Sequence, residues 1–459
     1  MAIVVKDGAK KAASERSDRP RFAPGRYSAR RLPFTLKAPK SFRACEGGYE
    51  QAQEVSIGLS AATPNSGRLR WGNRKGSGVS GKPMENGALP HAQPQRFYRP
   101  ELDAMRFFAF LCVFFHHTLS RVSVAGPISP YPFRDVFADS LKYAVSLFFL
   151  LSGYLITTLL NMEQESMGKV DLGAFYGRRI ARIWPLYYSF LVIVLLVGIA
   201  VPAQLPVSGA LLAFLFFSGN WFIYAAGGAA GGLGILWSVN VEEQFYLFWP
   251  LLIRLGRGRQ RRLIPAVILV CSYVLLIMYG ILRHNSDVAL RFNTPIEMQF
   301  FAAGAILAAW LPRAGLRIPF PLRWMLVLSG LSSWIIGDRW LSIFGKTEIR
   351  TIPEWWAPAA LYGCVLIGCV ALFLGFFGLP RRWLPAPLLW LGKISYGLYL
   401  YHSLVRSLMP RWQSGKYGVI RLGLELMMTI LISGISYHWL EVPFLRWKQR
   451  ITLVPNRPA

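Results

Sequence analysis

The sequence predicts an all-α, polytopic integral membrane protein with about ten transmembrane helices and both termini in the cytoplasm. The first observation is composition, because 53% of the 459 residues are hydrophobic and only 16% are charged. The second is that eleven apolar segments between residues 98 and 440 approach the ~20 residues that a helix needs to cross a bilayer. The third is an aromatic content of 14%, with 16 Trp, which suits the aromatic belts at membrane interfaces.

The cysteines and the net charge exclude several other classes of protein. The five cysteines form no CxxC pair, and four of them lie in apolar segments, so we predict neither a disulfide framework nor a metal site. A net charge of +28 would suggest nucleic-acid binding in a soluble protein. Here much of it lies in an N-terminal tail and in loops, where membrane topology explains it better. We therefore expect membrane lipids rather than nucleic acid as partners, and no bound cofactor.

Residues 1–97 are predicted to form a disordered, basic tail. The first 100 residues contain 19 Lys or Arg against 7 Asp or Glu, and they lack any long apolar run. Such a segment cannot bury enough apolar surface to offset the entropy of ordering it. We expect residues 1–83, which precede Met84, to be dispensable for activity. The alternative is a tether that binds anionic lipid.

The membrane domain is predicted to cover residues 98–447, and a cytoplasmic tail follows at 448–459. The first span is Tyr98–Ser120. The later apolar segments lie near 143–160, 184–201, 207–223, 236–253, 263–282, 296–311, 322–340, 358–378, 388–409 and 417–440. About 19 residues follow the last of them, so we expect no appended extracytoplasmic domain.

The distribution of basic residues indicates which segments cross the membrane. Arg254–Arg262 contains five arginines and Lys169–Arg182 contains four basic residues, so both loops are predicted to be cytoplasmic. The chain must then cross an even number of times between them, although three apolar segments lie there. The weakest is 207–223, which follows VPAQLP and precedes the Gly-rich AAGGAAGGLG. We predict that this segment is re-entrant or interfacial, which leaves ten spans.

The first span, YRPELDAMRFFAFLCVFFHHTLS, carries Asp103, Arg106, His116 and His117. An ionisable residue in a membrane helix costs about 2.5–3.5 kcal/mol on insertion scales and therefore usually has a function. Arg106 and His117 are 11 residues apart, which is three helical turns plus about 20°, so they share a face. Asp103 lies near that face, whereas His116 points about 100° away from His117. The alternative is that these residues only anchor the ends of the span.

Other ionisable residues are predicted to reach the depth of His117. On the topology above, Glu242 and Glu243 of WSVNVEEQFYLFWP and His402 of ISYGLYLYH lie in the same outer half of the membrane. Tyr396 precedes His402 by about two turns. Because charged residues in lipid mostly survive by pairing, we predict that the carboxylates and the histidines line one cavity.

A cluster of arginines stands on the cytoplasmic side, in FYGRRIARIWP. Arg178 and Arg182 share a helix face, and Arg179 lies between them. A fork of guanidinium groups is well suited to phosphate. Ordinary anchoring by positive residues is the alternative. In the first case a phosphate-bearing cytosolic donor could extend its reactive end toward a histidine, which can take a proton from a hydroxyl.

Six motifs, taken in order, resemble the acyltransferase 3 family of membrane-bound, acyl-CoA-dependent carbohydrate O-acyltransferases. They are RPELDAMR with ten residues between Arg106 and His117, LFFLLSGYLITTLL, FYGRRIARIWP, WSVNVEEQFYLFWPLL, LGKISYGLYLYH and YHWLEVPF. The resemblance covers about residues 98–447. Ala104 stands where the family usually has Gly, and His116 forms a doublet with His117, of which the spacing selects His117.

The resemblance implies roles for individual residues. It implies that His117 is the general base on the acceptor hydroxyl, that Arg106 is its catalytic partner, and that Glu242 is the carboxylate of the active site. The residues that we expect to contact a substrate are Asp103, Arg178, Arg179, Arg182, Glu243, Tyr396 and His402, the three arginines by engaging acyl-CoA.

The sequence therefore predicts an O-acyltransferase of the bacterial inner membrane. It would transfer an acetyl or other short acyl group from acyl-CoA to a hydroxyl of a carbohydrate or glycolipid, such as a cell-surface polysaccharide. One alternative is a transporter or exporter of a glycan or an acylated small molecule, because polar helices around a cavity are also typical of transporters. Another is a sensor or scaffold in which the histidines only pack.

Overall fold

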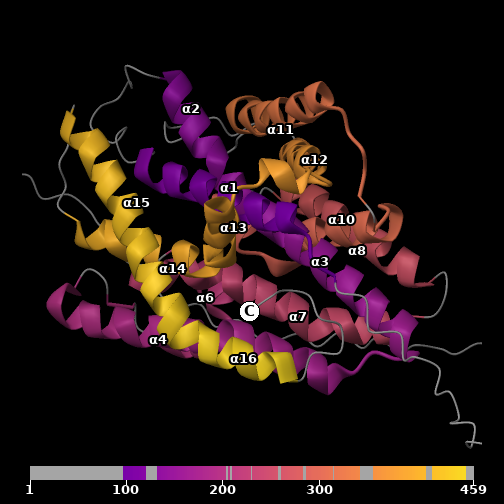
Figure 1. The fold of residues 1–459 in the computed structure, drawn as a ribbon. Helices are drawn as coiled ribbons and strands as arrows, with labels where there is room; N and C mark the ends of the chain where they lie inside the picture. The colour runs from indigo at the N-terminus through magenta and orange to yellow at the C-terminus, as the bar shows by residue number, and fades with distance from the viewer. Residues whose placement is uncertain are drawn as a thin grey trace, which may run out of the picture. The chain divides into compact units, whose positions relative to one another are not determined.

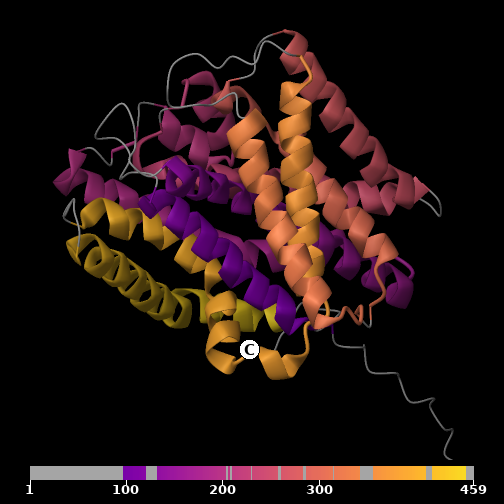
Figure 2. The same cartoon turned by 90° about the horizontal axis from the view of Figure 1, so that it is seen from above.

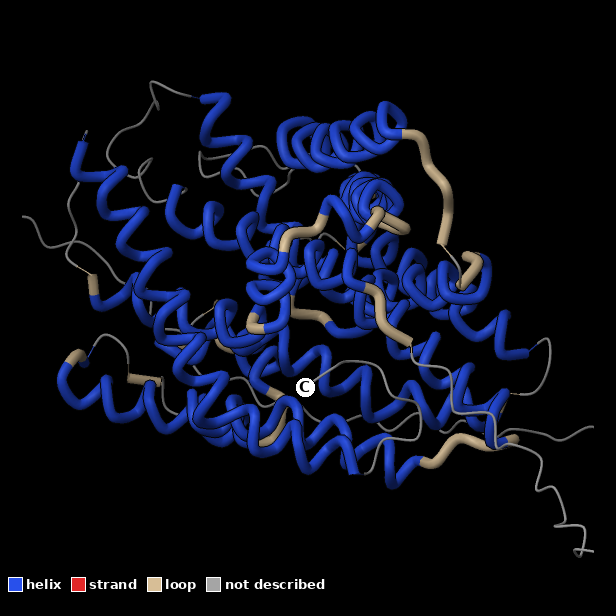
Figure 3. Tube along the Cα trace, in the orientation of Figure 1, coloured by secondary structure: helices blue, strands red, loops and turns tan. Residues whose placement is uncertain are grey.

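The computed structural model describes residues 97–119, 132–202, 205–206, 209–228, 230–256, 260–282, 286–313, 315–341, 355–409 and 416–450. Within these ranges the regular elements are helices and none is a strand (Figure 3). The predicted all-α class is thus confirmed for this part of the chain. The predicted tails at 1–97 and 448–459 lie outside the described residues, apart from Phe97 and the end of the last helix.

The helices follow one another along the chain as labelled in Figure 1. They are α1 (Pro100–Leu119), α2 (Pro132–Ser140), η2 (Leu141–Tyr143), α3 (Ala144–Met167), α4 (Leu172–Ala200), α5 (Ala210–Leu215), α6 (Gly219–Ala225), η4 (Gly231–Leu236), α7 (Trp237–Leu255), α8 (Gln260–Ile281), α9 (Asp287–Arg291), α10 (Thr294–Trp310), α11 (Phe320–Leu341), α12 (Ala357–Phe376), η5 (Arg381–Trp383), α13 (Ala386–Lys393), α14 (Ser395–Leu408), α15 (Lys416–Ser436), η6 (Tyr437–Glu441) and α16 (Val442–Arg450).

Seven helical stretches of the described chain are long and apolar enough to cross a membrane. They are Pro100–Leu119, Arg134–Met167, Leu172–Ala200, Arg262–Ile281, Phe320–Arg339, Ala357–Phe376 and Gly418–Trp447. Each coincides with a predicted span, so the chain is an integral membrane protein. The other three predicted spans fall on α7, on α10 and on the pair α13 and α14. The total of ten spans and the cytoplasmic termini remain predictions.

The segment 207–223, predicted not to cross, is folded into two short helices. Helix α5 has 6 residues and α6 has 7. At 1.5 Å per residue each is about 10 Å long, whereas the hydrocarbon core of a bilayer is about 30 Å thick. Phe217 between them has a positive φ of 54°, which turns the chain sharply. Neither helix can cross a membrane by itself.

Helix α1 occupies a central place, where it packs against α2, α3, α13 and α14 (Figure 1). Pro100 stands at its first position, where the missing N–H costs nothing. Glu101 and Asp103 lie in the first turn and His116 and His117 in the last, an order that the helix dipole favours. The packing of α1 therefore fixes the positions of both groups of polar residues.

The predicted single span at 388–409 is wrong in one respect, because the chain bends at Ile394 between α13 and α14. Gly392 lies against the backbone of α1, and a methyl group there would stand 2.1 Å from the backbone oxygen of Asp103. Figure 1 shows the two helices pointing in different directions. The bend lets α13 reach the start of α1 while α14 runs beside its later turns, an arrangement that helical periodicity alone does not reveal.

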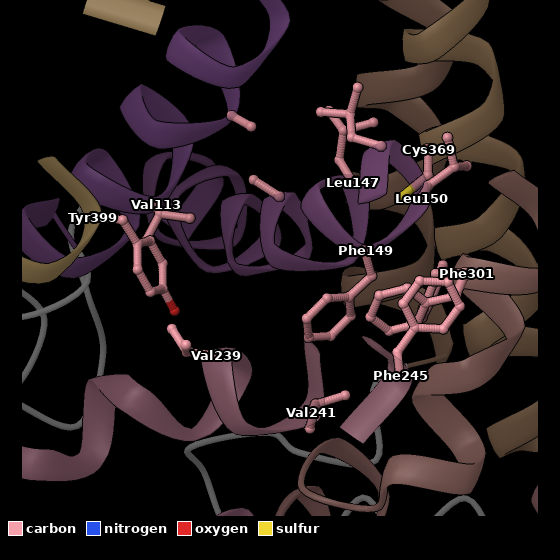
Figure 4. Packing of buried hydrophobic residues seen from close by; sticks show 14 of the residues in the cluster. Val113, Leu147, Phe149, Leu150, Val239, Val241, Phe245, Phe301, Cys369 and Tyr399 are labelled. Atoms are coloured by element: carbon pink, nitrogen blue, oxygen red, sulfur yellow. The ribbon is translucent and has the colours of Figure 1, made fainter. Parts of the chain in front are cut away.

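Glycines also allow the closest helix crossings, as is common in membrane proteins. A methyl group at Gly153 of α3 would stand 2.2 Å from the backbone oxygen of Phe301 on α10. Gly330 of α11 and Gly368 of α12 meet in the same way, where these two helices pack along each other (Figure 2). Beside the α3–α10 crossing, the Phe301 ring stacks between two others. Its ring centroid lies 4.8 Å from that of Phe149 and 4.2 Å from that of Phe245 (Figure 4).

Candidate active site

Two cavities lie end to end among α1, α3, α4, α7 and α14. The first, here called the arginine cavity, has a volume of about 100 Å³. Its lining residues are Arg106, Val145, Phe148, Phe149, Ser152, Leu155, Ile156, Arg179, Arg182, Ile183, Ser238, Val239, Glu242, Tyr246, Ser395, Tyr396 and Tyr399. This volume is below the ~300–1,000 Å³ of typical small-molecule sites, so the cavity suits a thin chain rather than a ring system.

Glu242 faces the arginine cavity, and two hydroxyl groups fix its carboxylate. Ser152 of α3 and Tyr246, one turn further along α7, both donate hydrogen bonds to Oε1 of Glu242. The guanidinium carbon of Arg179 lies 5.4 Å from the centroid of the Tyr246 ring. The carboxylate, the tyrosine and the arginine therefore form one polar group on the cavity wall, in which the anionic and cationic side chains offset each other.

Arg106 also lines the arginine cavity, and it forms an ion pair with a carboxylate other than Glu242. Its Nη1 atom donates to Oδ1 of Asp103 at 3.0 Å, and the Tyr98 hydroxyl donates to Oδ2 of that carboxylate at 3.2 Å. Asp103 is 1% exposed and does not line the arginine cavity. In the structure Asp103 is the ion-pair partner of Arg106, and its expected contact with a substrate stays a prediction.

Two of the three arginines of α4 line the arginine cavity, and the third forms an ion pair with α3. Helix α4 begins after Asp171, whose side chain caps it by accepting from the Ala174 N–H at 3.0 Å. Arg179 and Arg182 line the arginine cavity. Arg178 points instead to α3, where its Nη2 donates to Oε2 of the buried Glu163 at 2.7 Å. Sequence periodicity paired Arg178 with Arg182, but the carboxylate on α3 draws Arg178 away from the cavity.

Glu243 and Tyr396 lie nearby with different surroundings. The indole N–H of Trp184 donates to Oε2 of Glu243 at 3.4 Å, and this carboxylate is not among the residues that line the arginine cavity. Oε1 of Glu243 is buried and has no hydrogen-bond partner. Tyr396 does line the cavity, and its hydroxyl donates to the backbone oxygen of Ile183 at 3.3 Å.

The second cavity, here called the histidine cavity, has a volume of about 460 Å³, within the range of small-molecule sites. Its lining residues are Val113, His116, His117, Lys142, Val145, Ile223, Gly228, Gly231, Gly232, Gly234, Ile235, Trp237, Arg291, Phe292, Tyr399, Ser403, Leu404, Arg406 and Ser407. The Gly-rich segment before α7 forms part of the wall, where the absence of side chains leaves room for a ligand.

His117 and His402 meet at the edge of this cavity. Nε2 of His402 lies 3.2 Å from Nδ1 of His117, and Nδ1 of His402 lies 2.6 Å from the backbone oxygen of Tyr399. A carbonyl oxygen only accepts, so Nδ1 of His402 carries a proton, and Nε2 of the neutral ring accepts. Nδ1 of His117 is then the donor, and its Nε2 keeps a lone pair. This arrangement prepares His117 Nε2 to act as a base.

His116 has a separate anchor. Its Nδ1 lies 2.9 Å from the backbone oxygen of Ala138, so it donates to α2 while its ring lines the histidine cavity. The ring centroids of His116 and His117 are 5.0 Å apart. The two adjacent histidines therefore have different partners: His116 donates to a backbone oxygen, and His117 contacts the imidazole of His402.

Val145 and Tyr399 line both cavities, so they mark the place where the two cavities adjoin, here called the wall. Figure 4 shows the Tyr399 ring beside Val113 and its hydroxyl directed toward Val239. Val113 lines the histidine cavity and Val239 lines the arginine cavity. The Tyr399 hydroxyl is held in the wall by the Ser238 hydroxyl, with the two oxygens 2.7 Å apart.

The structure divides the predicted shared cavity into two cavities that adjoin each other. His117 and His402 lie on one side of the wall, and Glu242 lies on the other. The depth of Glu242 was counted from the start of α7 as though this helix began at the membrane surface. Helix α7 begins in the protein interior, after η4, and the boundary between the cavities falls in its first turn: Trp237 lines the histidine cavity and Ser238 the arginine cavity.

Several residues of the two cavities were missed from the sequence. Ser152 lies in LLSGYL, and Tyr246 follows Glu242 by four residues, a spacing that places both on one helix face. Arg406 follows His402 at the same spacing, and its Nη1 donates to the backbone oxygen of His117 at 2.5 Å. These spacings are visible signals. Lys142 and Arg291 carry no such signal. They lie in the short helices η2 and α9, and tertiary packing alone brings these helices to the cavity.

Comparisons with known proteins indicate the family of this chain. The model of one family, described as an acyltransferase domain, matches residues 99–438. A putative peptidoglycan O-acetyltransferase of Bacillus subtilis, YrhL, is 27% identical over 376 residues, which are 77% of this chain and 56% of that protein. The O-acetyltransferase OatA of Staphylococcus aureus is 28% identical over 368 residues, 75% of this chain and 57% of that protein. This chain thus spans little more than half the length of these relatives. No solved structure matches.

Proposed function

Because this chain belongs to the acyltransferase 3 family and is an acyltransferase, we propose that it transfers an acetyl or other short acyl group from acyl-CoA to a carbohydrate hydroxyl. The observation that carries the proposal is the contact of His402 with Nδ1 of His117, which leaves Nε2 of a residue that lines a cavity of ligand size as the basic nitrogen. The names of the relatives support an O-acetyl transfer. A transporter is the weaker alternative, because the family is enzymatic.

The arginine cavity is the proposed entrance for the donor. Arg179 and Arg182 would hold donor phosphates as guanidinium groups do elsewhere, and the narrow cavity would take the acyl-bearing arm. Arg106 and His117 are about 16 Å apart along α1 at 1.5 Å per residue. The arm would therefore extend past Glu242 to the wall at Val145 and Tyr399, where the thioester meets the histidine cavity.

The histidine cavity is the proposed site of the acceptor. Nε2 of His117 would take the proton from the acceptor hydroxyl as its oxygen attacks the thioester carbonyl carbon. The C–O bond forms and the C–S bond breaks, and the departing sulfur takes a proton from the His117 imidazolium, which restores the neutral base. His402 would keep Nδ1 of His117 protonated throughout, in the way that an orienting group serves a catalytic histidine.

The topology completes the proposal. The arginine cavity would open to the cytoplasm, where acyl-CoA is found, and the histidine cavity to the outer side of the bacterial inner membrane. The excess of basic residues in Lys169–Arg182 and Arg254–Arg262 supports this orientation.

Labelled acetyl-CoA tests the proposal directly. Membranes that contain the protein are incubated with it and with a polysaccharide or glycolipid extract, and the labelled product is treated with mild base to release ester-bound acetate. We expect label in the carbohydrate fraction with the wild type and none with His117→Ala at equal protein level. Equal labelling by the two proteins would refute the proposal.

A further inference from the structure

Three cationic side chains from three separate elements line the histidine cavity. They are Lys142 of η2, Arg291 at the end of α9 and Arg406 of α14. No aspartate or glutamate is found among the described residues that line this cavity. Its walls therefore present an excess of positive charge around His117.

The three cations are not equivalent. Nζ of Lys142 lies 2.7 Å from Oδ1 of Asp338, which offsets much of its charge from outside the cavity. Arg406 is fixed beside the base, because its Nη1 donates to the backbone oxygen of His117 at 2.5 Å. Arg291 lines the cavity from α9. Arg291 and Arg406 therefore bring two guanidinium groups to the cavity lining from two different helices.

Charge inside a membrane protein is costly, and cationic residues in such places commonly serve a ligand. Two aromatic side chains line the same cavity, Trp237 and Phe292, with ring centroids 5.1 Å apart in an edge-to-face arrangement. Aromatic surface suits the apolar face of a sugar ring, and arginine suits a carboxylate or phosphate. The two features together describe a sugar that carries an anion.

We propose that the acceptor is an anionic carbohydrate, with a carboxylate or phosphate held by Arg291 and Arg406 while a neighbouring hydroxyl faces Nε2 of His117. The inference rests on the proposed function, since it places the acceptor in the histidine cavity. A sugar acid and a sugar phosphate share this chemistry, and the experiment below separates them.

Binding to the purified full-length protein tests the proposal without a need for turnover. Three probes are compared: a uronic-acid oligosaccharide, its neutral methyl ester, and an otherwise neutral oligosaccharide that carries one phosphate at its reducing end. We expect at least one anionic probe to bind about tenfold more tightly than the ester, and added salt to reduce the difference. Preference for the first identifies a sugar carboxylate, and preference for the third identifies a phosphate.

Variants connect this preference to the cavity. Arg291→Gln should bring the Kd of the preferred probe to within about twofold of that of the ester, and Arg291→Lys should restore part of the difference. Arg254→Gln is the matched control, because Arg254 is exposed at the end of α7 and does not line the cavity. It should preserve the preference in full.

Equal binding of the three probes by the wild type would overturn the inference. So would an unchanged preference in a folded Arg291→Gln protein. Failure of the proposed function has a different signature, namely that no carbohydrate is acetylated in the labelling experiment while the anionic probes still bind. The two outcomes are thereby distinguished.

Discussion

Nε2 of His402 lies 3.2 Å from Nδ1 of His117, although 285 residues separate the two in the chain. The pair joins the last turn of α1 to the middle of α14. Since the other nitrogen of His402 is bound to the backbone oxygen of Tyr399, the contact sets which nitrogen of His117 holds a proton. These contacts suit His402 to position His117, whereas its expected contact with a substrate stays a prediction.

The first prediction concerns this pair. His402→Ala should lower kcat by about 10²-fold, the scale at which orienting partners of histidines act, and leave KM for acyl-CoA nearly unchanged. His402→Gln should recover part of the rate, since an amide can still accept a hydrogen bond from Nδ1 of His117. Initial rates of labelled acetyl transfer at equal protein level measure both. A matching rise in KM for acyl-CoA would instead place His402 at the donor.

The second prediction separates the arginines of α4. Arg182→Lys should raise the apparent KM for acyl-CoA about tenfold, because a lysine cannot reproduce the guanidinium fork. Arg178→Gln should act on stability, because it leaves the buried Glu163 carboxylate without its ion pair, a loss of about 3–5 kcal/mol in buried pairs. Thermal unfolding of the purified protein and donor titrations distinguish the effects. Normal stability with a raised KM in Arg178→Gln would contradict this division.

The third prediction concerns the contact of α13 with α1. Gly392→Ala should lower both stability and kcat, because the added methyl group would stand 2.1 Å from the backbone oxygen of Asp103, the residue that holds Arg106. Gly423→Ala on α15 is the matched control. A methyl group there meets nothing within 4 Å, so this change should be neutral or stabilise by up to about 1 kcal/mol through helix propensity. Equal behaviour of the two variants would refute the close contact.

The fourth prediction concerns topology. Single cysteines at Gly228 and Gln260 in a cysteine-free protein should react from opposite sides of the membrane with an impermeant maleimide. Gly228 is exposed before η4 and should be labelled from outside, whereas Gln260 is exposed at the start of α8 and should be labelled only in inverted vesicles. Labelling of both from one side would mean that 207–223 crosses the membrane after all.

Much of the fold followed from the sequence because membrane helices are specified locally. Apolar length alone located α1, α3, α4, α8, α11, α12 and α15, and the segment 207–223, which was set apart from them, holds two short helices. Sequence motifs led to His117 and to Glu242, and both prove to line cavities.

The direction of the Arg178 side chain and the bend at Ile394 could not be predicted from the sequence, because both involve contacts between residues that are far apart in the chain. Periodicity makes Arg178 and Arg179 equally good neighbours of Arg182 on a helix. Glu163 on α3 decides between them, by binding Arg178. The bend at Ile394 likewise depends on the backbone of Asp103, almost 300 residues earlier. Helix periodicity carries no information on such contacts, so the arrangement of the two cavities emerged only from the fold.

The wall at Val145 and Tyr399 also bears on the electric field of the membrane. If the cavities open on opposite sides as proposed, aqueous space would reach the wall from both directions, and most of the membrane voltage would fall across this thin layer. A charge that passed through would exchange about 2.3 kcal/mol with a potential of 100 mV. An acetyl group is neutral and would pass without that exchange, while the phosphates of the proposed carrier would stay behind. Acyl transfer across such a wall would therefore be indifferent to voltage, and a closed wall would spare the cell an ion leak.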